Sequence, residues 1–372
     1  MQKKYIIIPK PLQIVIDDVG WWNSKDESNE NKPYRTGFCR MHSPSDYEAI
    51  AHLGRRLHIR PMIAMILCDW DREGILKNVP GAVWDSKNWT RQTVHLKRCE
   101  QAADIIQRNK SCLEFTMHGI GHEYWLPDGT MQRAEWYDNT GTMRDPAILK
   151  QHLDAYMEIT NQWQLCESIK SFVPCAFLFR FGDAKQNFAE ILKRYGIQRI
   201  STPFQRMAFS EPTQRPHWGR QSGITIMDRD DCPIPWNTIA ASPQDLELCG
   251  ITLGLHWPNL LHQNPERNKE VIEQWVFRLQ KLQSTFGRIL SKNSQEFHAQ
   301  VLYQDLTTIQ IKNNTIIFDF ENFLRYFPKH FACGFAIHLQ DTESTKGFRT
   351  THIFPQNKQK HLIFKSDDVQ NK

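Results

Sequence analysis

The sequence predicts an α/β barrel followed by a smaller β-rich C-terminal region. Short apolar runs typical of strands alternate with helical patterns through residues 1–292, which indicates a parallel sheet or barrel with helices outside. About seven strand candidates favour a closed or nearly closed (β/α) barrel over an open doubly wound sheet. No Gly-x-Gly-x-x-Gly sequence follows the first strand, so the sequence does not support a dinucleotide site.

The elements of the barrel can be placed in chain order. The first strand, residues 14–16, is a β-branched apolar run between Pro11 and Gly20 that is too short for a helix. The first helical pattern covers residues 46–58, with Ser45 expected at the N-cap. Further strands are expected at 61–67, 111–117, 172–179, 197–201, 224–227 and 251–255, and further helices at 91–108, 146–165, 184–195 and 266–282.

The last part of the chain has a different pattern. Residues 301–306, 308–312, 315–320 and 333–339 have the composition of strands, and Asn313-Asn314 is expected to form a hairpin turn. We therefore expect two domains, a barrel formed by residues 1–292 and a small β-rich region formed by residues 293–372.

Composition excludes several classes of protein. The 372 residues are 40% hydrophobic, enough to bury a large core, and the net charge of +5 is spread over the chain without a basic motif for nucleic acid. Nine cysteines without a Cys-x-x-Cys spacing argue against a disulfide framework or a cysteine zinc site and favour a reducing compartment. The N-terminal apolar run is too short for a signal peptide, and no stretch approaches the roughly 20 apolar residues of a membrane span. A cytoplasmic location is therefore expected.

Two adjacent carboxylates, Asp17 and Asp18, follow the first strand. Like charges at close range in a poorly solvated place repel each other, and a bound cation would relieve that repulsion. The C-terminal end of a strand is also where metal-assisted chemistry is found in α/β proteins. The alternative is a turn or a helix cap, because Asp is common at both.

A second candidate feature follows the strand expected at residues 111–117. His118 and His122 are separated by three residues, two of which are glycines, so their rings can converge on one point. Zinc and similar ions bind imidazole nitrogen readily. With Asp18 as a third ligand, the set would leave positions open for water and substrate, as in a catalytic metal site. A chain with 15 histidines also produces this spacing by chance.

These motifs resemble those of the polysaccharide deacetylase (NodB-like, carbohydrate esterase) family, in the glycoside hydrolase/deacetylase barrel superfamily. Asp17-Asp18 is similar to the family's Thr-Phe-Asp-Asp-Gly motif, and His118 to His122 to its His-Ser/Thr-x-x-His motif. Residues 179–182, Phe-Arg-Phe-Gly, are similar to its Arg-x-Pro-x-Gly motif, and residues 253–256, Leu-Gly-Leu-His, to its Leu-x-Ile-His motif. The resemblance covers roughly residues 12–260 and implies a deformed (β/α)7 barrel.

The resemblance implies a metal-dependent deacetylase that acts on an N- or O-acetylated carbohydrate. Asp18, His118 and His122 would hold one divalent metal ion, expected to be zinc, with cobalt, nickel, iron or manganese as alternatives. A water molecule activated by the ion would attack an amide or ester carbonyl, and the ion with a backbone N–H would stabilise the oxyanion.

Three further roles follow from the same resemblance. Asp17 would be the general base, and Arg180 would pair with it and keep it ionised. His256 would protonate the leaving amine or alkoxide. Taken alone, Arg180 is as well explained by a surface ion pair and His256 by a structural hydrogen bond.

The chain also departs from the family's motifs. Val19 separates Asp18 from Gly20, and Gly119 replaces the hydroxyl residue after the first histidine. The segment at 180–182 lacks the proline and is one residue short. The Asp-x-x-Asp-Trp motif has no clean counterpart, although residues 228–231 followed by Trp236 come nearest. We therefore expect a divergent member of the family.

The twelve tryptophans also suggest a carbohydrate substrate, because aromatic faces stack on sugar rings. Four that follow expected strand ends are candidate substrate-binding residues: Trp21, Trp22, Trp125 and Trp257. The alternative is that they pack the loops down. Two other functions stay open: a C–N hydrolase that uses the same site on a small amide, and a carbohydrate-binding protein of this fold that has lost turnover.

Overall fold

The structure is a computed structural model that describes residues 4–23, 36, 38–83, 95–181, 187–206, 215–229, 233–312, 315–341 and 347–365. Its contacts divide the chain into two compact units. The larger unit is residues 14–278, and the smaller unit combines residues 1–13 with residues 279–372. No helix in the described ranges is both long enough and apolar enough to cross a membrane.

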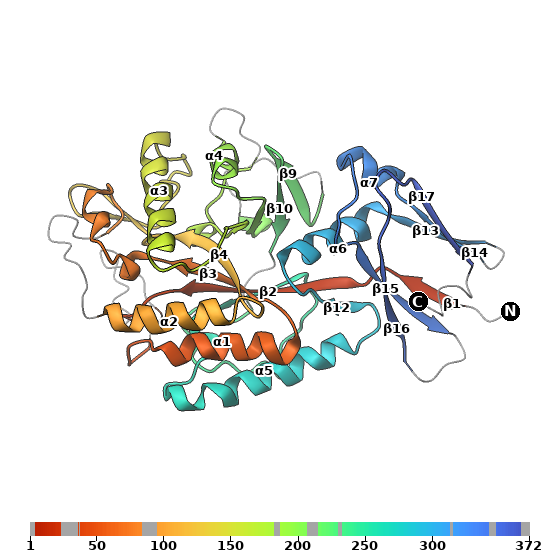
Figure 1. Cartoon of the computed structure of the whole chain (residues 1–372), viewed down its shortest axis with the longest axis horizontal. Helices are drawn as coiled ribbons and strands as arrows, with labels where there is room; N and C mark the ends of the chain where they lie inside the picture. The colour runs from red at the N-terminus through yellow and green to blue at the C-terminus, as the bar shows by residue number, and fades with distance from the viewer. Residues whose placement is uncertain are drawn as a thin grey trace. The chain divides into compact units, whose positions relative to one another are not determined.

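The larger unit is built on a curled sheet of eight strands in the order β11-β2-β3-β4-β7-β8-β10-β9 (Figure 1). The strands are β2 (Lys10–Val19), β3 (Met62–Ile66), β4 (Glu114–Gly119), β7 (Ser171–Phe172), β8 (Arg199–Thr202), β9 (Trp218–Gln221), β10 (Ile224–Asp228) and β11 (Thr252–His256). Strands β2, β3, β4, β7, β8 and β10 pair in parallel in chain order, and β9 adds antiparallel to β10. The last strand, β11, lies beside the first, which is the strand order of a barrel.

Helices follow most of these strands, as the alternating sequence pattern predicts. They are α1 (Pro44–Leu57), α2 (Leu96–Arg108), α3 (Pro146–Gln162), α4 (Phe188–Arg194) and α5 (Asn268–Gln283). Helices α1 and α2 pack against each other (Figure 1). The chain between β4 and α3 carries a short hairpin of β5 (Tyr124–Trp125) and β6 (Met131–Gln132). The predicted α/β barrel class is therefore confirmed, with a sheet that is curled and open rather than closed.

Three of the elements differ from the expectation. The N-cap of α1 is Ser43 rather than Ser45, because Pro44 is favoured at the first helical position and the Asp46 side chain accepts the Ser43 N–H at 3.0 Å. The strand expected at 172–179 ends at Phe172, and a 3-10 turn, Cys175–Phe177, follows Pro174. Residues 301–306 are helical, since they complete α6 (Ser294–Leu306).

The smaller unit contains two antiparallel sheets with two helices. Strands β1 (Lys4–Ile7), β15 (Phe335–Asp341) and β16 (Arg349–Ile353) form one sheet in that order. Strands β13 (Thr308–Lys312), β14 (Thr315–Asp319) and β17 (His361–Lys365) form the other. The helices are α6 and α7 (Glu321–Tyr326), and β12 (Arg288–Leu290) pairs in parallel with the start of β2. The expected turn at Asn313-Asn314 lies outside the described residues.

Pairing of the two ends of the chain decides the division into units. Each residue of β1 pairs with one of β15, from Lys4 opposite Asp341 to Ile7 opposite His338. Gln300 on α6 donates to the carbonyl of Pro9 at 3.0 Å, which also joins the first residues to the last. The structural division therefore differs from the one expected from the sequence in residues 1–13 and 279–292. The division into a barrel domain of residues 1–292 and a β-rich region of residues 293–372 stays a prediction.

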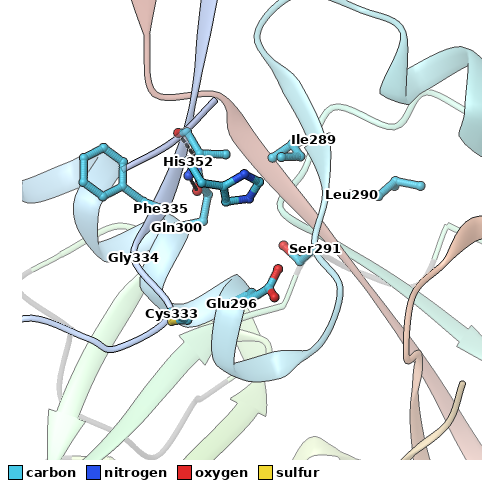
Figure 2. A pocket seen from close by; sticks show the side chains of 10 residues that line it. Ile289, Leu290, Ser291, Glu296, Gln300, Cys333, Gly334, Phe335 and His352 are labelled. Carbon is cyan, nitrogen blue, oxygen red and sulfur yellow. Dashed lines mark hydrogen bonds between the residues drawn. The ribbon is translucent and has the colours of Figure 1, made fainter. Parts of the chain in front are cut away.

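The smaller unit encloses a small cavity, shown in Figure 2. Glu296, Gln300, Cys333 and His352 are among its lining residues, and its volume is about 20 Å³. A water molecule needs about 10 to 15 Å³ on the same measure, so this cavity has room for one water and not for a substrate.

Candidate metal centre

A β-bulge near the end of β2 presents the two adjacent carboxylates. Ile16 pairs with Ile63 and Val19 with Met65, so three steps along β2 match two steps along β3. Asp18 has a φ of 58°, the left-handed conformation that bulges and functional sites often contain. The bulge thus accommodates one extra residue in β2, and Val19 pairs with Met65 of β3.

The chain then turns at Gly20, where only glycine fits. Its φ is 128°, and a Cβ at this position would lie 2.0 Å from the carbonyl oxygen of Ile66. The departure from the family motif at Val19 therefore does not remove the turn; it places one paired residue between the carboxylates and the turn.

Asp17 is buried and paired with an arginine that the sequence did not single out. Nη1 of Arg229 donates to Oδ1 of Asp17 at 2.9 Å, and Nη2 lies 2.7 Å from Oδ2. Arg229 follows β10, its side chain is fully buried, and its guanidinium lies 4.6 Å from the ring centre of Phe177. Arg229 is thus the arginine that pairs with Asp17 in this structure, and the expected pairing with Arg180 stays a prediction.

A partial signal for this arginine was present in the sequence. Arg229 lies in the 228–231 segment that comes nearest to the missing Asp-x-x-Asp-Trp motif, in which acidic residues and not an arginine are expected. Asp228 accepts the backbone N–H of Phe204 at 2.8 Å, while Asp230 and Asp231 lie outside the described residues. Gly182 of the Arg180 segment also lies outside them.

Asp18 points toward two histidines at the end of β4. Its Oδ1 lies 3.3 Å from Nε2 of His118 and 4.0 Å from Nε2 of His122. Among the described histidine, cysteine, aspartate and glutamate side chains, one group of three could hold a metal ion: Asp18, His118 and His122. Their ligand atoms all lie within 4.8 Å of one another. Oδ1 of Asp18 is buried and accepts no hydrogen bond from any described residue. The structure thus brings the three expected ligands together.

The hydrogen bond of His118 fixes which nitrogen faces Asp18. Nδ1 of His118 lies 2.7 Å from the carbonyl oxygen of Val173, so Nδ1 carries the proton and donates. In the neutral ring, Nε2 then directs a lone pair at a carboxylate oxygen, and two acceptors that face each other need a cation between them. A proton on Nε2 is the other solution, in line with the raised pKa of His118: burial opposes the raised value, and Asp18 outweighs it.

His122 has a different environment. The backbone N–H of Ala176 donates to its Nε2 at 3.2 Å, so this nitrogen carries a lone pair. Burial lowers the pKa of His122 to about 3, against the opposing effect of Asp18. For Asp18, burial would raise the pKa, but His118, His122 and His256 together hold it well below its ordinary value. An ionised carboxylate beside a neutral imidazole is the protonation state that a metal ligand set requires.

His256 lies on the other side of Asp18. It is the last residue of β11, and its Nε2 lies 3.9 Å from Oδ2 of Asp18. It falls outside the 4.8 Å set, which fits a proton donor better than a fourth ligand. The side chain of Asn259 accepts the His256 N–H at 2.8 Å and donates to the carbonyls of Pro235 and Thr238, which holds the end of this strand in place.

The four tryptophans that were candidate substrate-binding residues are buried. Trp21, Trp22, Trp125 and Trp257 have exposed fractions of 2%, 0%, 6% and 0%. Trp22 packs against Tyr47 and Trp70, and Trp257 stacks on His42 with ring centres 3.9 Å apart. Their faces are therefore used for packing in this structure, and a role in binding sugar rings stays a prediction.

Comparison with known proteins gives only distant likenesses. The sequence matches no protein-family model. No curated protein matches it either. A "putative polysaccharide deacetylase" from Mycobacterium smegmatis is similar in structure over 73% of this chain and 82% of its own, at 9% identity and a TM-score of 0.41.

Two further solved structures are similar over less of their own length. The 4-alpha-glucanotransferase from Thermococcus litoralis matches over 78% of this chain and 40% of its own, at 13% identity and a TM-score of 0.39. The GH57-type branching enzyme from Pyrococcus horikoshii matches over 60% and 47%, at 8% identity and a TM-score of 0.34. Similarity at this level carries no argument about activity, so the function has to be argued from the residues.

Proposed function

We propose that this protein is a metal-dependent hydrolase that removes acetyl groups from an N- or O-acetylated carbohydrate. One observation carries the proposal: Asp18, His118 and His122 converge within 4.8 Å around a buried carboxylate oxygen that lacks a hydrogen-bond donor among the described residues. Two imidazoles and one carboxylate with room for further ligands suit a catalytic zinc or similar ion. The hydrogen bond from His118 Nδ1 to Val173 orients the ligand ring as ligating histidines require.

The chemistry that a divalent cation supplies at such a site is Lewis acidity, which acidifies a water molecule and polarises a carbonyl. Asp17 accepts the proton of that water in this proposal. Arg229 engages one side of its carboxylate through two contacts, and each oxygen retains a second lone pair for a proton. His256, on the opposite side of Asp18, donates a proton to the leaving group.

A backbone donor near the ligands completes the proposed machinery. Ala176 has a φ of 52°, and its N–H lies 3.2 Å from Nε2 of His122. If Nε2 of His122 held a cation, this N–H would be available to donate to the developing oxyanion of the substrate. Strained backbone of this kind persists where the surrounding structure holds it, here in the 3-10 turn after Pro174.

The acetylated carbohydrate is the part of the proposal that depends on the four motifs and their order. The same residues would serve a hydrolase of small amides, and the two substrates can be compared directly. We expect acetate release from acetylated oligosaccharides at saturating zinc and little hydrolysis of free small amides. The reverse preference would favour the amide hydrolase, and glycan binding without acetate release would favour the binding protein.

The decisive measurement is the metal content of protein purified without chelator. We expect about one divalent ion per chain in the wild type, and loss of that ion in Asp18→Ala and His122→Ala. Asp17→Asn should keep the ion and lose acetate release, since Asp17 is assigned a proton and not a ligand role. Asp71→Asn, which changes another buried carboxylate, serves as the control and should keep both. Unchanged metal content in Asp18→Ala would show that the site is wrong.

A further inference from the structure

Glu135 is a fully buried carboxylate that holds the backbone between the two histidines. Its Oε2 accepts the N–H of Ile120 at 2.7 Å and the N–H of Gly121 at 3.2 Å. The next residue, Trp136, donates its indole N–H to the carbonyl of His118 at 3.0 Å. Side chains from one short segment thus bind three of the backbone groups that set the path from His118 to His122.

Glu135 is itself held from the other side by His152 on α3. Nδ1 of His152 lies 2.9 Å from Oε1 of Glu135, and Nε2 lies 2.7 Å from the carbonyl oxygen of Pro80. Both ring nitrogens lie within hydrogen-bond distance of an oxygen, so His152 links Glu135 to the backbone of Pro80. The carboxylate therefore has one orientation in which all its hydrogen bonds form.

Close packing around Gly119 explains why this chain lacks the family's hydroxyl residue there. A Cβ on Gly119 would lie 2.3 Å from Oε2 of Glu135 and 2.7 Å from the sulfur of Cys175. The φ of Gly119 is not positive, so the close approach of these two groups, and not backbone conformation, requires glycine. The carboxylate of Glu135 thus occupies the space that a side chain at position 119 would fill.

We propose that Glu135 is a positioning residue that sets the spacing and orientation of His118 and His122 for a divalent cation. This inference rests on the proposed function, in which these histidines are ligands. Glu135 acts through the backbone amides of Ile120 and Gly121, which lie between the two histidines. A fixed loop lowers the cost of organising the ligands, and supporting interactions of this kind are worth about 10- to 100-fold in metal affinity.

The test compares zinc affinity in four proteins by competition with a chromogenic chelator. Glu135→Ala should bind zinc about 10- to 100-fold more weakly than the wild type. Glu135→Gln should stay within about threefold, because an amide oxygen can still accept from Ile120 and Gly121 while its NH2 donates to a neutral His152. The matched control is Asp71→Ala: Asp71 also accepts backbone N–H groups, from Gly74, Ile75 and Leu76, away from the histidines. We expect it to leave zinc affinity unchanged.

Hydrogen exchange in the metal-free protein separates this inference from the proposed function. In Glu135→Ala the amides of Ile120 and Gly121 should exchange at least about tenfold faster, whereas those of Gly74 to Leu76 should not change. Unchanged exchange at Ile120 and Gly121, or equal zinc affinity in Glu135→Ala and wild type, would overturn the inference. A wild type that binds no zinc through Asp18 would overturn the proposed function instead.

Two variants keep the test decisive if Glu135→Ala does not fold. Gly119→Ala retains Glu135 but forces its carboxylate away from the loop, and we expect the same loss of zinc affinity. Glu135→Gln distinguishes hydrogen bonding from charge: a loss as large as that expected for Glu135→Ala would mean that the negative charge and not the positioning of the loop matters, which contradicts the inference.

Discussion

Two buried clusters in the larger unit combine a carboxylate with histidine, and they differ in how the carboxylate is used. Asp46 accepts five hydrogen bonds of 2.8–3.0 Å, from both Nη atoms of Arg40, Nδ1 of His42, the N–H of Ser43 and the side chain of Asn268. Asp18 has imidazole nitrogens at 3.3–4.0 Å, and its Oδ1 accepts no hydrogen bond from a described residue. A carboxylate whose oxygens all accept hydrogen bonds stabilises the fold. A carboxylate with an oxygen that accepts none and that faces imidazole nitrogens is suited to bind a cation.

The Asp46 cluster ties the start of α1 to the segment before α5. Arg40 donates to the carbonyl of His262 at 3.1 Å, and Asn268 accepts the N–H of His262 at 2.8 Å. Burial would raise the pKa of Asp46, but the hydrogen bonds from His42 and Arg40 hold it well below its ordinary value. Both carboxylates are therefore ionised, so charge alone does not distinguish the two clusters. They differ in the number of hydrogen bonds that each carboxylate accepts.

The largest effect is expected at Asp17, which is a neighbour of Asp18 in sequence but forms a buried ion pair with Arg229. Arg229→Met should lower the free energy of unfolding by about 3–5 kcal/mol, because it leaves the Asp17 carboxylate buried without its partner. Arg180→Met is the matched control, and its loss should stay within about 1 kcal/mol. Urea denaturation measures both. A larger loss in the Arg180 variant would return the role of partner to Arg180.

The same substitution at Asp46 and Asp18 tests the comparison directly. Asp46→Asn should cost about 3 kcal/mol in the free energy of unfolding, because Arg40 and His42 lose the charge they bind. Asp18→Asn in metal-free protein should cost clearly less than Asp46→Asn, since no hydrogen bond to Oδ1 is lost. Equal losses in the two variants would show that Asp18 is a structural carboxylate like Asp46.

The smallest effect is expected from His338, a buried histidine in the smaller unit that is held by a backbone group. Its Nδ1 accepts the N–H of Gly287 at 3.0 Å, and burial lowers its pKa to about 4. The unfolded chain binds a proton near pH 6.5 and the folded one only near pH 4, so stability is lost as the pH falls between these values. We expect a loss of about 2–3 kcal/mol over this range in urea denaturation.

His338→Gln is the control for this pH dependence. Glutamine can accept the Gly287 N–H and does not titrate, so the variant should show a shallower slope of stability between pH 6.5 and 4. An identical slope in both proteins would assign the pH dependence to other groups.

The sequence determined the order and type of most elements and the residues that meet at the candidate metal centre. Alternating apolar runs and helical patterns are local properties, so the strands of the barrel and the helices that follow them could be placed from the chain alone. Asp18 lies near the end of β2, His118 lies near the end of β4 and His122 just after it, and parallel strands in a barrel bring such ends to one edge. Their convergence could therefore be expected, and their service as metal ligands stays a prediction.

Only the tertiary structure decided what each polar group faces. A sequence gives Arg180 and Arg229 the same charge, but only the packing around β10 brings one guanidinium to Asp17. Residues 301–306 join a helix because burial on several sides removes the periodicity that tells a helix from a strand. The burial of the tryptophans and the close approach of Gly119 to Glu135 also depend on tertiary packing. All of these features are set by neighbours far along the chain, which local sequence patterns do not encode.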